Sequence, residues 1–197
     1  MEQEGYYHIY NHANGIENLF RTDENYHYFL KRYSHFIYPV ADTFAYCLMP
    51  NHFHFLIKTK ELVQISEVSE TSDVLDETIP NLKNPYSKAF SDLFNSYTKA
   101  YNKMFNRRGS LFNRQFKRKA VENDEYFTKL IHYIHANPVH HGFVNTIEDW
   151  PFSSYHAFLS NKASLLNRNE VLELFHGKED FVKFHKQPID LKIDLEM

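Results

Sequence analysis

The 197-residue sequence predicts an α+β domain, in which an antiparallel sheet carries helices packed mainly on one of its faces. The prediction rests on the order of the segments, which read as strand, helix, strand, strand, helix, strand and helix. A tight turn at Pro50-Asn51 joins two of the strands into a hairpin, and such a turn pairs strands antiparallel. A hydrophobic content of 43%, with 14 Tyr and 18 Phe, is enough for a full core that is largely aromatic.

The first part of the chain contains strands on either side of a helix. Residues 5–11 are rich in aromatic and β-branched side chains, which favour a strand. Thr22 can cap a helix with acidic residues in its first turn and apolar residues at helical spacing up to Ile37. The strand over 43–48 alternates, and this places three apolar side chains on one side: Phe44, Tyr46 and Leu48.

The later part of the chain has two longer helices. Pro85 to Met104 is amphipathic, and residues 111–121 then resemble a strand with basic side chains on its exposed side. Asn123 caps a further helix, which we expect to end at about Asn137, because the residue before a proline is biased away from helical geometry.

Two segments lack such a pattern. Residues from about 60 to 84 are polar and acidic without a clear period, and we interpret them as a mobile insertion, either a plain solvated linker or a functional lid. We therefore predict one domain over residues 1–160, with this insertion inside it. Residues 161–197 form a C-terminal tail.

Composition excludes several classes of function. The single Cys47 rules out an internal disulfide and a cysteine-based zinc site, and the chain has no glycine-rich phosphate loop. The acidic N-terminus lacks the apolar segment of a signal peptide, and no apolar run approaches membrane-spanning length. We expect a cytoplasmic protein that does not contact a membrane.

Charge is distributed unevenly. The net charge is −3, which alone disfavours binding to nucleic acid. No acidic residue occurs between Asp92 and Glu122, however, and this window contains eight basic ones: Lys99, Lys103, Arg107, Arg108, Arg114, Lys117, Arg118 and Lys119. Such a basic window is a candidate surface for a phosphate backbone.

His52 and His54 are candidate metal ligands. Side chains alternate across a strand, so the two imidazoles share one face, roughly 7 Å apart along the chain. The opposite face carries the apolar side chains Phe53, Phe55 and Ile57. The two histidines can bind one metal ion, or they can be a hydrogen-bonded structural pair. The pattern alone favours the second interpretation.

Tyr133 and Asn137 are neighbours on the last predicted long helix, because they are four residues apart. An amide oxygen can be the third ligand of a divalent cation, and a tyrosine hydroxyl can be a covalent nucleophile. The alternative is that Tyr133 is one of many core aromatics and that Asn137 only ends the helix before Pro138.

Several motifs occur together and in one order over about residues 5–160. They are residues 45–54 (AYCLMPNHFH), 109–112 (GSLF), 133–139 (YIHANPV) and 150–155 (WPFSSY), with Asn14-Gly15 to Leu19-Phe20 before them. On these motifs the chain resembles the single-tyrosine HUH transposases of bacterial insertion sequences, in particular the branch of REP-associated tyrosine transposases.

This resemblance implies a ferredoxin-like HUH endonuclease core over residues 1–160. It implies that His52, His54 and Asn137 hold Mg²⁺ or Mn²⁺ and that Tyr133 is the catalytic nucleophile. The implied reaction is metal-dependent cleavage and rejoining of single-stranded DNA, at hairpin-flanked sites, through a 5′-phosphotyrosine intermediate. The implied DNA-binding residues lie in the basic window: Lys103, Arg107, Arg108, Arg114, Lys117, Arg118 and Lys119.

Two departures from the family pattern bear on DNA contacts. His140 and His141 stand where relatives often carry Arg and Ala, and the basic residue expected at Gln115 is found at Arg114. Two other functions stay open. One is a domesticated DNA-hairpin-binding protein with little or no strand transfer, and the other is a metal-dependent hydrolase of small phosphoesters. The family includes monomers and homodimers, so the oligomeric state is open too.

Overall fold

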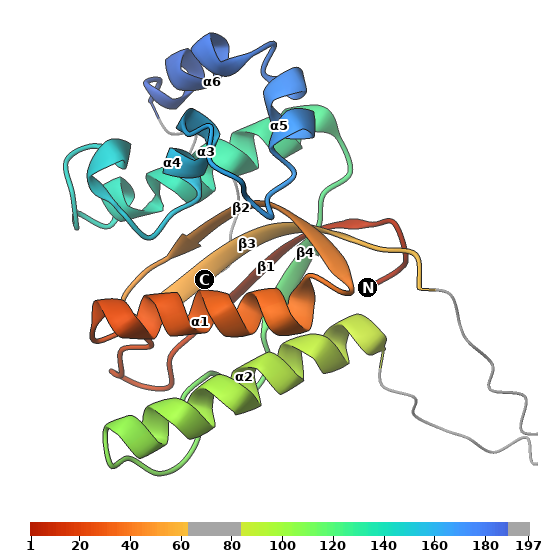
Figure 1. Ribbon diagram of the computed structural model, residues 1–197. Coiled ribbons are helices and arrows are strands. Elements are labelled where there is room, and N and C mark those ends of the chain that lie inside the picture. Colours follow the sequence, from red (N-terminus) through yellow and green to blue (C-terminus); the bar gives the residue numbers. More distant parts are fainter. Residues whose placement is uncertain (63–83, 189–197) are drawn as a thin grey trace, which may run out of the picture.

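A computed structural model describes residues 1–62 and 84–188 (Figure 1). Within these residues the chain forms an antiparallel sheet of four strands in the order β2-β3-β1-β4. The strands are β1 (Tyr6–His12), β2 (Ala41–Leu48), β3 (His52–Thr59) and β4 (Lys117–Ala120). The predicted α+β class and antiparallel sheet are confirmed. The predicted mobile insertion at about 60–84 lies almost entirely outside the described residues.

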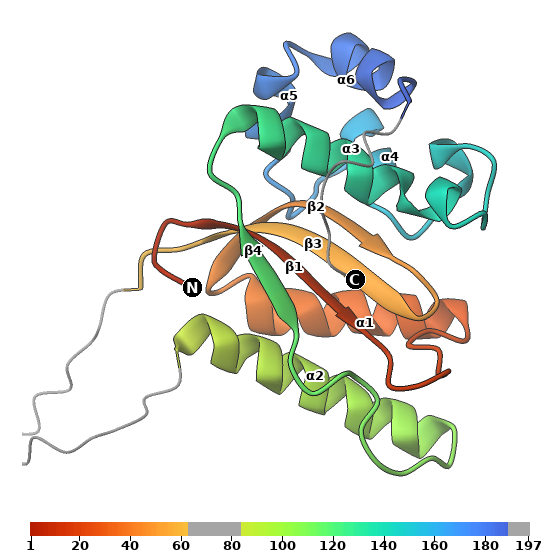
Figure 2. The ribbon, with the colours of Figure 1, turned by 180° about the vertical axis from the view of Figure 1, so that it is seen from behind.

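Helices cover both faces of the sheet (Figures 1 and 2). One face carries α1 (Asp23–Ile37) and α2 (Pro85–Met104). The other carries α3 (Asp124–His140), α4 (Tyr155–Leu159), α5 (Arg168–Leu174) and α6 (Lys178–His185), with a short 3₁₀ helix, η1 (Ile147–Asp149). This arrangement corrects the expectation of helices mainly on one face. None of the described helices is long and apolar enough to cross a membrane.

The inner strand β3 explains the two helical layers. Its Phe53, Phe55 and Ile57 are buried in the core beneath α1 and α2, whereas Leu56 is buried in a second core beneath α3. A sheet face that carries apolar side chains has to be covered, so a strand that is apolar on both sides requires a layer on each.

The core beneath α1 and α2 is aromatic, as the composition predicts. Tyr33 stacks on Phe55 with ring centroids 4.1 Å apart, and the ring of Phe29 meets Tyr97 edge-on at 5.0 Å. The Tyr97 hydroxyl donates a hydrogen bond to the carbonyl of Leu19 at 2.6 Å. These rings therefore fix both helices and the segment that precedes α1.

The second core includes the described part of the predicted tail. Val171, Phe175 and Phe181 come from the segment that follows residue 160, and they are buried in the same cluster as Ile131 and Ile134 of α3. This segment thus adds apolar area to the core over α3. The domain division at residue 160 stays a prediction.

Three local expectations differ from the structure. A β-bulge between Thr43 and Ala45 turns Phe44 into the second core, away from Tyr46 and Leu48, because a bulge inserts one residue into the alternation. Helix α3 continues through Pro138 to His140, since the burial of its last turns outweighs the local bias. The strand predicted over 111–121 is only β4.

Ser154 links three elements through buried hydrogen bonds. Its hydroxyl accepts from the Tyr46 amide of β2 at 2.8 Å and lies 2.7 Å from His135 Nε2 of α3. His135 Nδ1 lies in turn 2.8 Å from His185 Nε2 of α6. Ser154 and His135 are fully buried, so their polar atoms depend on one another.

We predict that Ser154→Ala lowers the free energy of unfolding by about 1–3 kcal/mol, because it leaves buried partners unpaired. Urea denaturation followed by circular dichroism measures this. The control is Ser91→Ala, whose exposed hydroxyl bonds only within its own helix, and which should change stability by less than about 0.5 kcal/mol. Equal effects of the two substitutions would contradict the assigned role of Ser154.

Candidate active site

The sheet and α3 bring the predicted metal ligands together. His52 begins β3, and its Nε2 lies 2.9 Å from Oδ1 of Asn137 in α3, which is 85 residues later in the chain. His54 follows on the same face of β3, and its ring meets the Tyr133 ring edge-on with centroids 5.7 Å apart. The four predicted site residues therefore surround one place between the sheet and α3.

Helix geometry positions Tyr133 and Asn137. Both lie in α3, four residues apart, and α3 stays helical past Asn137 to His140. Side chains at this spacing stand one above the other on one face. Because α3 covers the sheet face that carries His52 and His54, this helical face meets the two histidines.

The site contains polar atoms that point toward one another without full pairing. His52 Nδ1 lies 2.8 Å from Asn51 Oδ1. In one tautomer His52 Nε2 donates to Asn137 Oδ1; when Nδ1 carries the proton and donates to Asn51 instead, Nε2 and Asn137 Oδ1 are two lone pairs that face each other, as two ligands of one cation would. His54 Nε2 and Asn137 Nδ2 are also buried and have no hydrogen-bond partner among the described residues.

These donors fit a divalent cation. Burial lowers the pKa of His52 to about 4 and the pKa of His54 well below its ordinary value. Both imidazoles are thus neutral at neutral pH, which is the form that binds metal. No group of three His, Cys, Asp or Glu side chains in residues 1–62 and 84–188 could hold a metal ion, so the amide of Asn137 is needed to complete a three-ligand set.

Tyr133 is a shielded phenol. Its side chain is 5% exposed. Burial raises its pKa to about 12, and a polar contact with the Asn137 side chain offsets part of that rise. The hydroxyl is therefore protonated at neutral pH, and it must lose its proton when it acts as a nucleophile.

Two other histidines of α3 face away from Tyr133, as helical geometry predicts. His132 packs against Phe184 and His185, and His135 hydrogen-bonds to His185 and Ser154. Both are buried against the C-terminal helices and are part of the second core.

Two of the predicted DNA-binding lysines lie on the site's face of the sheet. β4 is an edge strand beside β1 (Figure 2). All four of its residues are exposed. Lys117 Nζ lies 5.9 Å from the ring centroid of Tyr10, which pairs in register with His54, and Lys119 Nζ lies 5.2 Å from that of Tyr126 in α3. Arg118 alternates to the other face.

The remaining predicted DNA-binding residues differ in their surroundings. Arg108 and Arg114 are exposed in the connection between α2 and β4. Lys103 lies on α2, across the sheet from the candidate ligands. The structure thus brings Lys117 and Lys119 to the site's face and leaves Lys103 away from it. The DNA-binding role of each stays a prediction.

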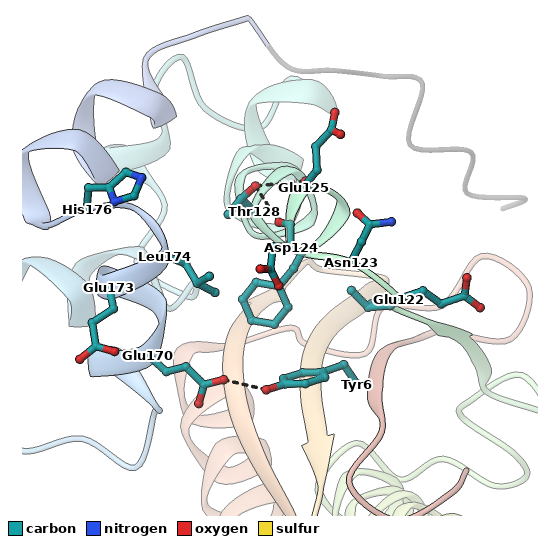
Figure 3. Close-up of a pocket in the computed structure, with 12 residues that line it drawn as sticks. Tyr6, Glu122, Asn123, Asp124, Glu125, Thr128, Glu170, Glu173, Leu174 and His176 are labelled. Atoms are coloured by element: carbon teal, nitrogen blue, oxygen red, sulfur yellow. Dashed lines mark hydrogen bonds between the residues drawn. The ribbon is translucent and has the colours of Figure 1, made fainter.

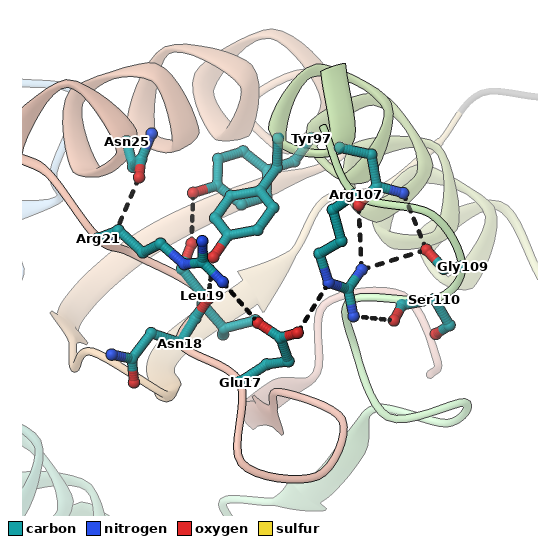
Figure 4. A network of polar contacts seen from close by, with 11 residues as sticks. Glu17, Asn18, Leu19, Arg21, Asn25, Tyr97, Arg107, Gly109 and Ser110 are labelled. Carbon is teal, nitrogen blue, oxygen red and sulfur yellow. Dashed lines mark hydrogen bonds and ion pairs between the residues drawn. The ribbon is translucent and has the colours of Figure 1, made fainter. Parts of the chain in front are cut away.

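Arg107 is held inside a network of polar contacts (Figure 4). Its Nε donates to Glu17 Oε1 at 3.0 Å, and its Nη1 donates to Asn102 Oδ1 at 3.0 Å. Nη1 and Nη2 also donate to the carbonyls of Gly109 and Ser110, at 3.3 and 2.8 Å. The guanidinium therefore joins the loop after β1 to the turn after α2.

A pocket of about 690 Å³ lies elsewhere, between the start of α3 and α5 (Figure 3). Five of its twelve lining residues are acidic: Glu122, Asp124, Glu125, Glu170 and Glu173. The Tyr6 hydroxyl donates to Glu170 Oε1 at 2.7 Å at its base. None of the predicted ligands lines this pocket, and its charge is unsuited to a phosphate backbone.

Sequence reasoning missed His8, whose Nε2 lies 2.9 Å from His54 Nδ1. It also missed His12, whose ring stacks on His52 at 4.7 Å. The signal that was available is the period of two in His8, Tyr10 and His12, which places all three on one face of β1. The pairing of β1 with β3 then sets Tyr10 against His54 and His12 against His52.

We predict that Arg107→Ala lowers the free energy of unfolding by about 1–3 kcal/mol, because its side chain is only 16% exposed and donates to four acceptors. Arg108→Ala is the matched control and should change stability by less than about 0.5 kcal/mol, since Arg108 is exposed. Urea denaturation of both variants measures this difference in the free energy of unfolding. A neutral Arg107→Ala would show that the network is not stabilising.

Comparisons with known proteins agree with the fold and with the motifs. No family model matches the chain. A Haemophilus influenzae protein named putative REP-associated tyrosine transposase is 29% identical over 115 residues, which cover 58% of this chain and 59% of that protein. The REP-associated tyrosine transposase of Escherichia coli K12 is 43% identical over 37 residues, covering 19% of this chain and 22% of that protein.

The chain thus matches 59% and 22% of the lengths of these two relatives. A solved structure of a REP-associated tyrosine transposase bound to a REP hairpin aligns with a TM-score of 0.58 and 18% identity, over 84% of this chain and 90% of that one. This likeness shows the fold. The resemblance inferred from the motifs is confirmed: the chain has homologues named REP-associated tyrosine transposases, and it shares the fold of the solved member.

Proposed function

We propose that the protein cleaves and rejoins single-stranded DNA beside hairpins, with Tyr133 as the nucleophile and with Mg²⁺ or Mn²⁺ held by His52, His54 and Asn137. The observation that carries the proposal is the 2.9 Å approach of His52 Nε2 to Asn137 Oδ1 beside Tyr133, between segments 85 residues apart. Hairpin DNA as the substrate class is supported by the structural relative, which is bound to a REP hairpin.

Tyr133 carries the covalent step. When bound, the cation would act as a Lewis acid on the scissile phosphate. Tyr133 Oη attacks the phosphorus and loses its proton, the bond from phosphorus to the 3′-oxygen breaks, and that oxygen takes up a proton. The product is a 5′-phosphotyrosine and a free 3′-OH. Attack by a 3′-OH on this linkage releases Tyr133 and joins the strands.

The site's surroundings suit this step. α3 and the sheet bury Tyr133 and both histidines, so these side chains have little contact with water before DNA binds. Lys117 and Lys119 stand on the same face at the open edge of the sheet, where they can contact the phosphates of a strand that leads to Tyr133.

A second candidate function is hairpin binding with little or no strand transfer. One observation favours it, namely that the Tyr133 side chain is only 5% exposed and its pKa is raised to about 12. A phenol in this state is a poor nucleophile until DNA or a cation rearranges its surroundings.

We predict that the protein forms a covalent adduct with hairpin-flanked single-stranded DNA in the presence of Mn²⁺ or Mg²⁺, and that Tyr133→Phe abolishes it while binding persists. Denaturing gels detect the adduct, and band shifts measure binding. Tyr126→Phe is the matched control from the same helix and should still form the adduct. EDTA should prevent the adduct in every variant.

The outcomes separate the functions. Binding without any adduct in the unmodified chain supports the hairpin-binding function. Cleavage that survives Tyr133→Phe supports a metal-dependent phosphoesterase in which the tyrosine is incidental.

We predict that Lys117→Ala or Arg114→Ala weakens DNA binding and lowers its salt dependence. For single-stranded DNA, the slope of log K against log salt becomes shallower by about 0.7 for each phosphate that no longer has a basic partner. Titrations at several salt concentrations measure this slope. Lys31→Ala, an exposed lysine of α1 across the sheet, should leave it unchanged. An unchanged slope in the first two variants would show that this surface is merely solvated.

A further inference from the structure

His8 is a buried histidine of β1 that the proposed reaction does not use. It is fully buried, and its Nε2 lies 2.9 Å from Nδ1 of His54, which is fully buried too. The second nitrogen of each ring, His8 Nδ1 and His54 Nε2, has no hydrogen-bond partner among the described residues. The pair is therefore joined by one hydrogen bond.

One hydrogen bond between two neutral imidazoles has two arrangements. In the first, His54 Nδ1–H donates to His8 Nε2, and His54 Nε2 keeps its lone pair. In the second, His8 Nε2–H donates to His54 Nδ1, and His54 Nε2 carries the proton. Only the first arrangement lets His54 bind a cation through Nε2. Each arrangement leaves one buried N–H without a partner. The number of hydrogen bonds within the pair is therefore the same in both and does not favour either arrangement.

His52, the other candidate ligand, also has a polar partner at its Nδ1 atom. His52 Nδ1 lies 2.8 Å from Asn51 Oδ1, while His52 Nε2 points to Asn137. An amide oxygen only accepts, so Asn51 Oδ1 pairs with the Nδ1–H form of His52, and in that form Nε2 keeps its lone pair. Both candidate ligands thus have a partner at Nδ1 and leave Nε2 to the site. Partners of this kind orient metal-binding histidines.

Packing prevents His8 from turning away. Its ring lies nearly coplanar with the His54 ring, at an interplanar angle of 19° and with centroids 5.1 Å apart, as an N–H···N hydrogen bond in the plane of both rings requires. The Tyr10 ring stacks on His8 at 4.8 Å and on His54 at 5.8 Å.

We propose that His8 is a positioning residue, which accepts the Nδ1–H of His54 and thereby holds His54 Nε2 unprotonated and aimed at the cation. This inference rests on the proposed function, because it presupposes the metal site. It assigns His8 to the binding of the cation and not to the chemistry at Tyr133.

The test compares Mn²⁺ binding, followed by electron paramagnetic resonance of free Mn²⁺, in His8→Leu and His8→Gln. His8→Leu should weaken binding by about 10–100-fold, the usual loss when such a partner is removed. His8→Gln should recover most of it, since a glutamine amide oxygen reaches about as far as Nε2 and accepts. His132→Leu is the matched control, because His132 is buried against Phe184 and His185 and should leave Mn²⁺ affinity unchanged.

A second measurement reads the tautomer itself. ¹⁵N NMR of the imidazoles, in the unmodified protein with diamagnetic Mg²⁺, should show His54 protonated at Nδ1 and His8 unprotonated at Nε2. A His54 that carries its proton at Nε2 overturns the inference. This holds even if His8→Leu fails to fold.

The two proposals fail in different ways. If His54→Ala loses Mn²⁺ but His8→Leu binds it as tightly as the unmodified chain, the role of His8 is wrong and the metal site stands. If the unmodified chain and His54→Ala bind Mn²⁺ equally, the metal site is wrong, and the role of His8 falls with it.

Discussion

Strand β3 has to be buried on both sides, and the rest of the structure follows from this constraint. Its phenylalanines require the layer of α1 and α2, and its Leu56 requires the layer of α3. The sheet face that α3 covers also carries His52 and His54. Covering the apolar part of that face therefore removes both imidazoles from water. The lowered pKa values of these histidines, the raised pKa of Tyr133 and the unpaired nitrogens are all consequences of one packing requirement.

Desolvation gives the site its chemical character. Buried polar atoms need partners, and the histidines meet this need at Nδ1 through Asn51 and His8, so that their other nitrogens remain directed between the sheet and α3. The same burial that keeps the imidazoles neutral also keeps Tyr133 protonated. The low pKa values leave the imidazole nitrogens unprotonated, so a cation would meet no competing proton there. In the proposed reaction, the protonated Tyr133 would need a change in its surroundings before it could act as the nucleophile.

The parts that were predictable are those determined by nearby residues. Capping and apolar spacing placed α1 and α2 correctly, and a spacing of four residues placed Tyr133 beside Asn137. The continuation of α3 past Pro138 and the bulge at Phe44 were missed, because tertiary burial overrides local preference there. The meeting of His52 with Asn137 came only from the family resemblance. His8 was missed because the register of β1 against β3 is set by contacts far apart in the chain. Arg107 and Arg108 are adjacent and chemically alike, and only their contacts distinguish them.

The Arg107 network has a consequence for conformational entropy. It joins the loop after β1 to the turn after α2, and the hydroxyls of Tyr97 and Tyr101 hold the same loop through the carbonyls of Leu19 and Asn18. Two separate connections are thereby linked by side-chain hydrogen bonds, and Arg108 is exposed beside them. A ligand that binds there has little backbone left to order. Such a ligand loses less of its contact free energy to ordering the backbone, and it therefore binds more tightly than it would to two independent loops.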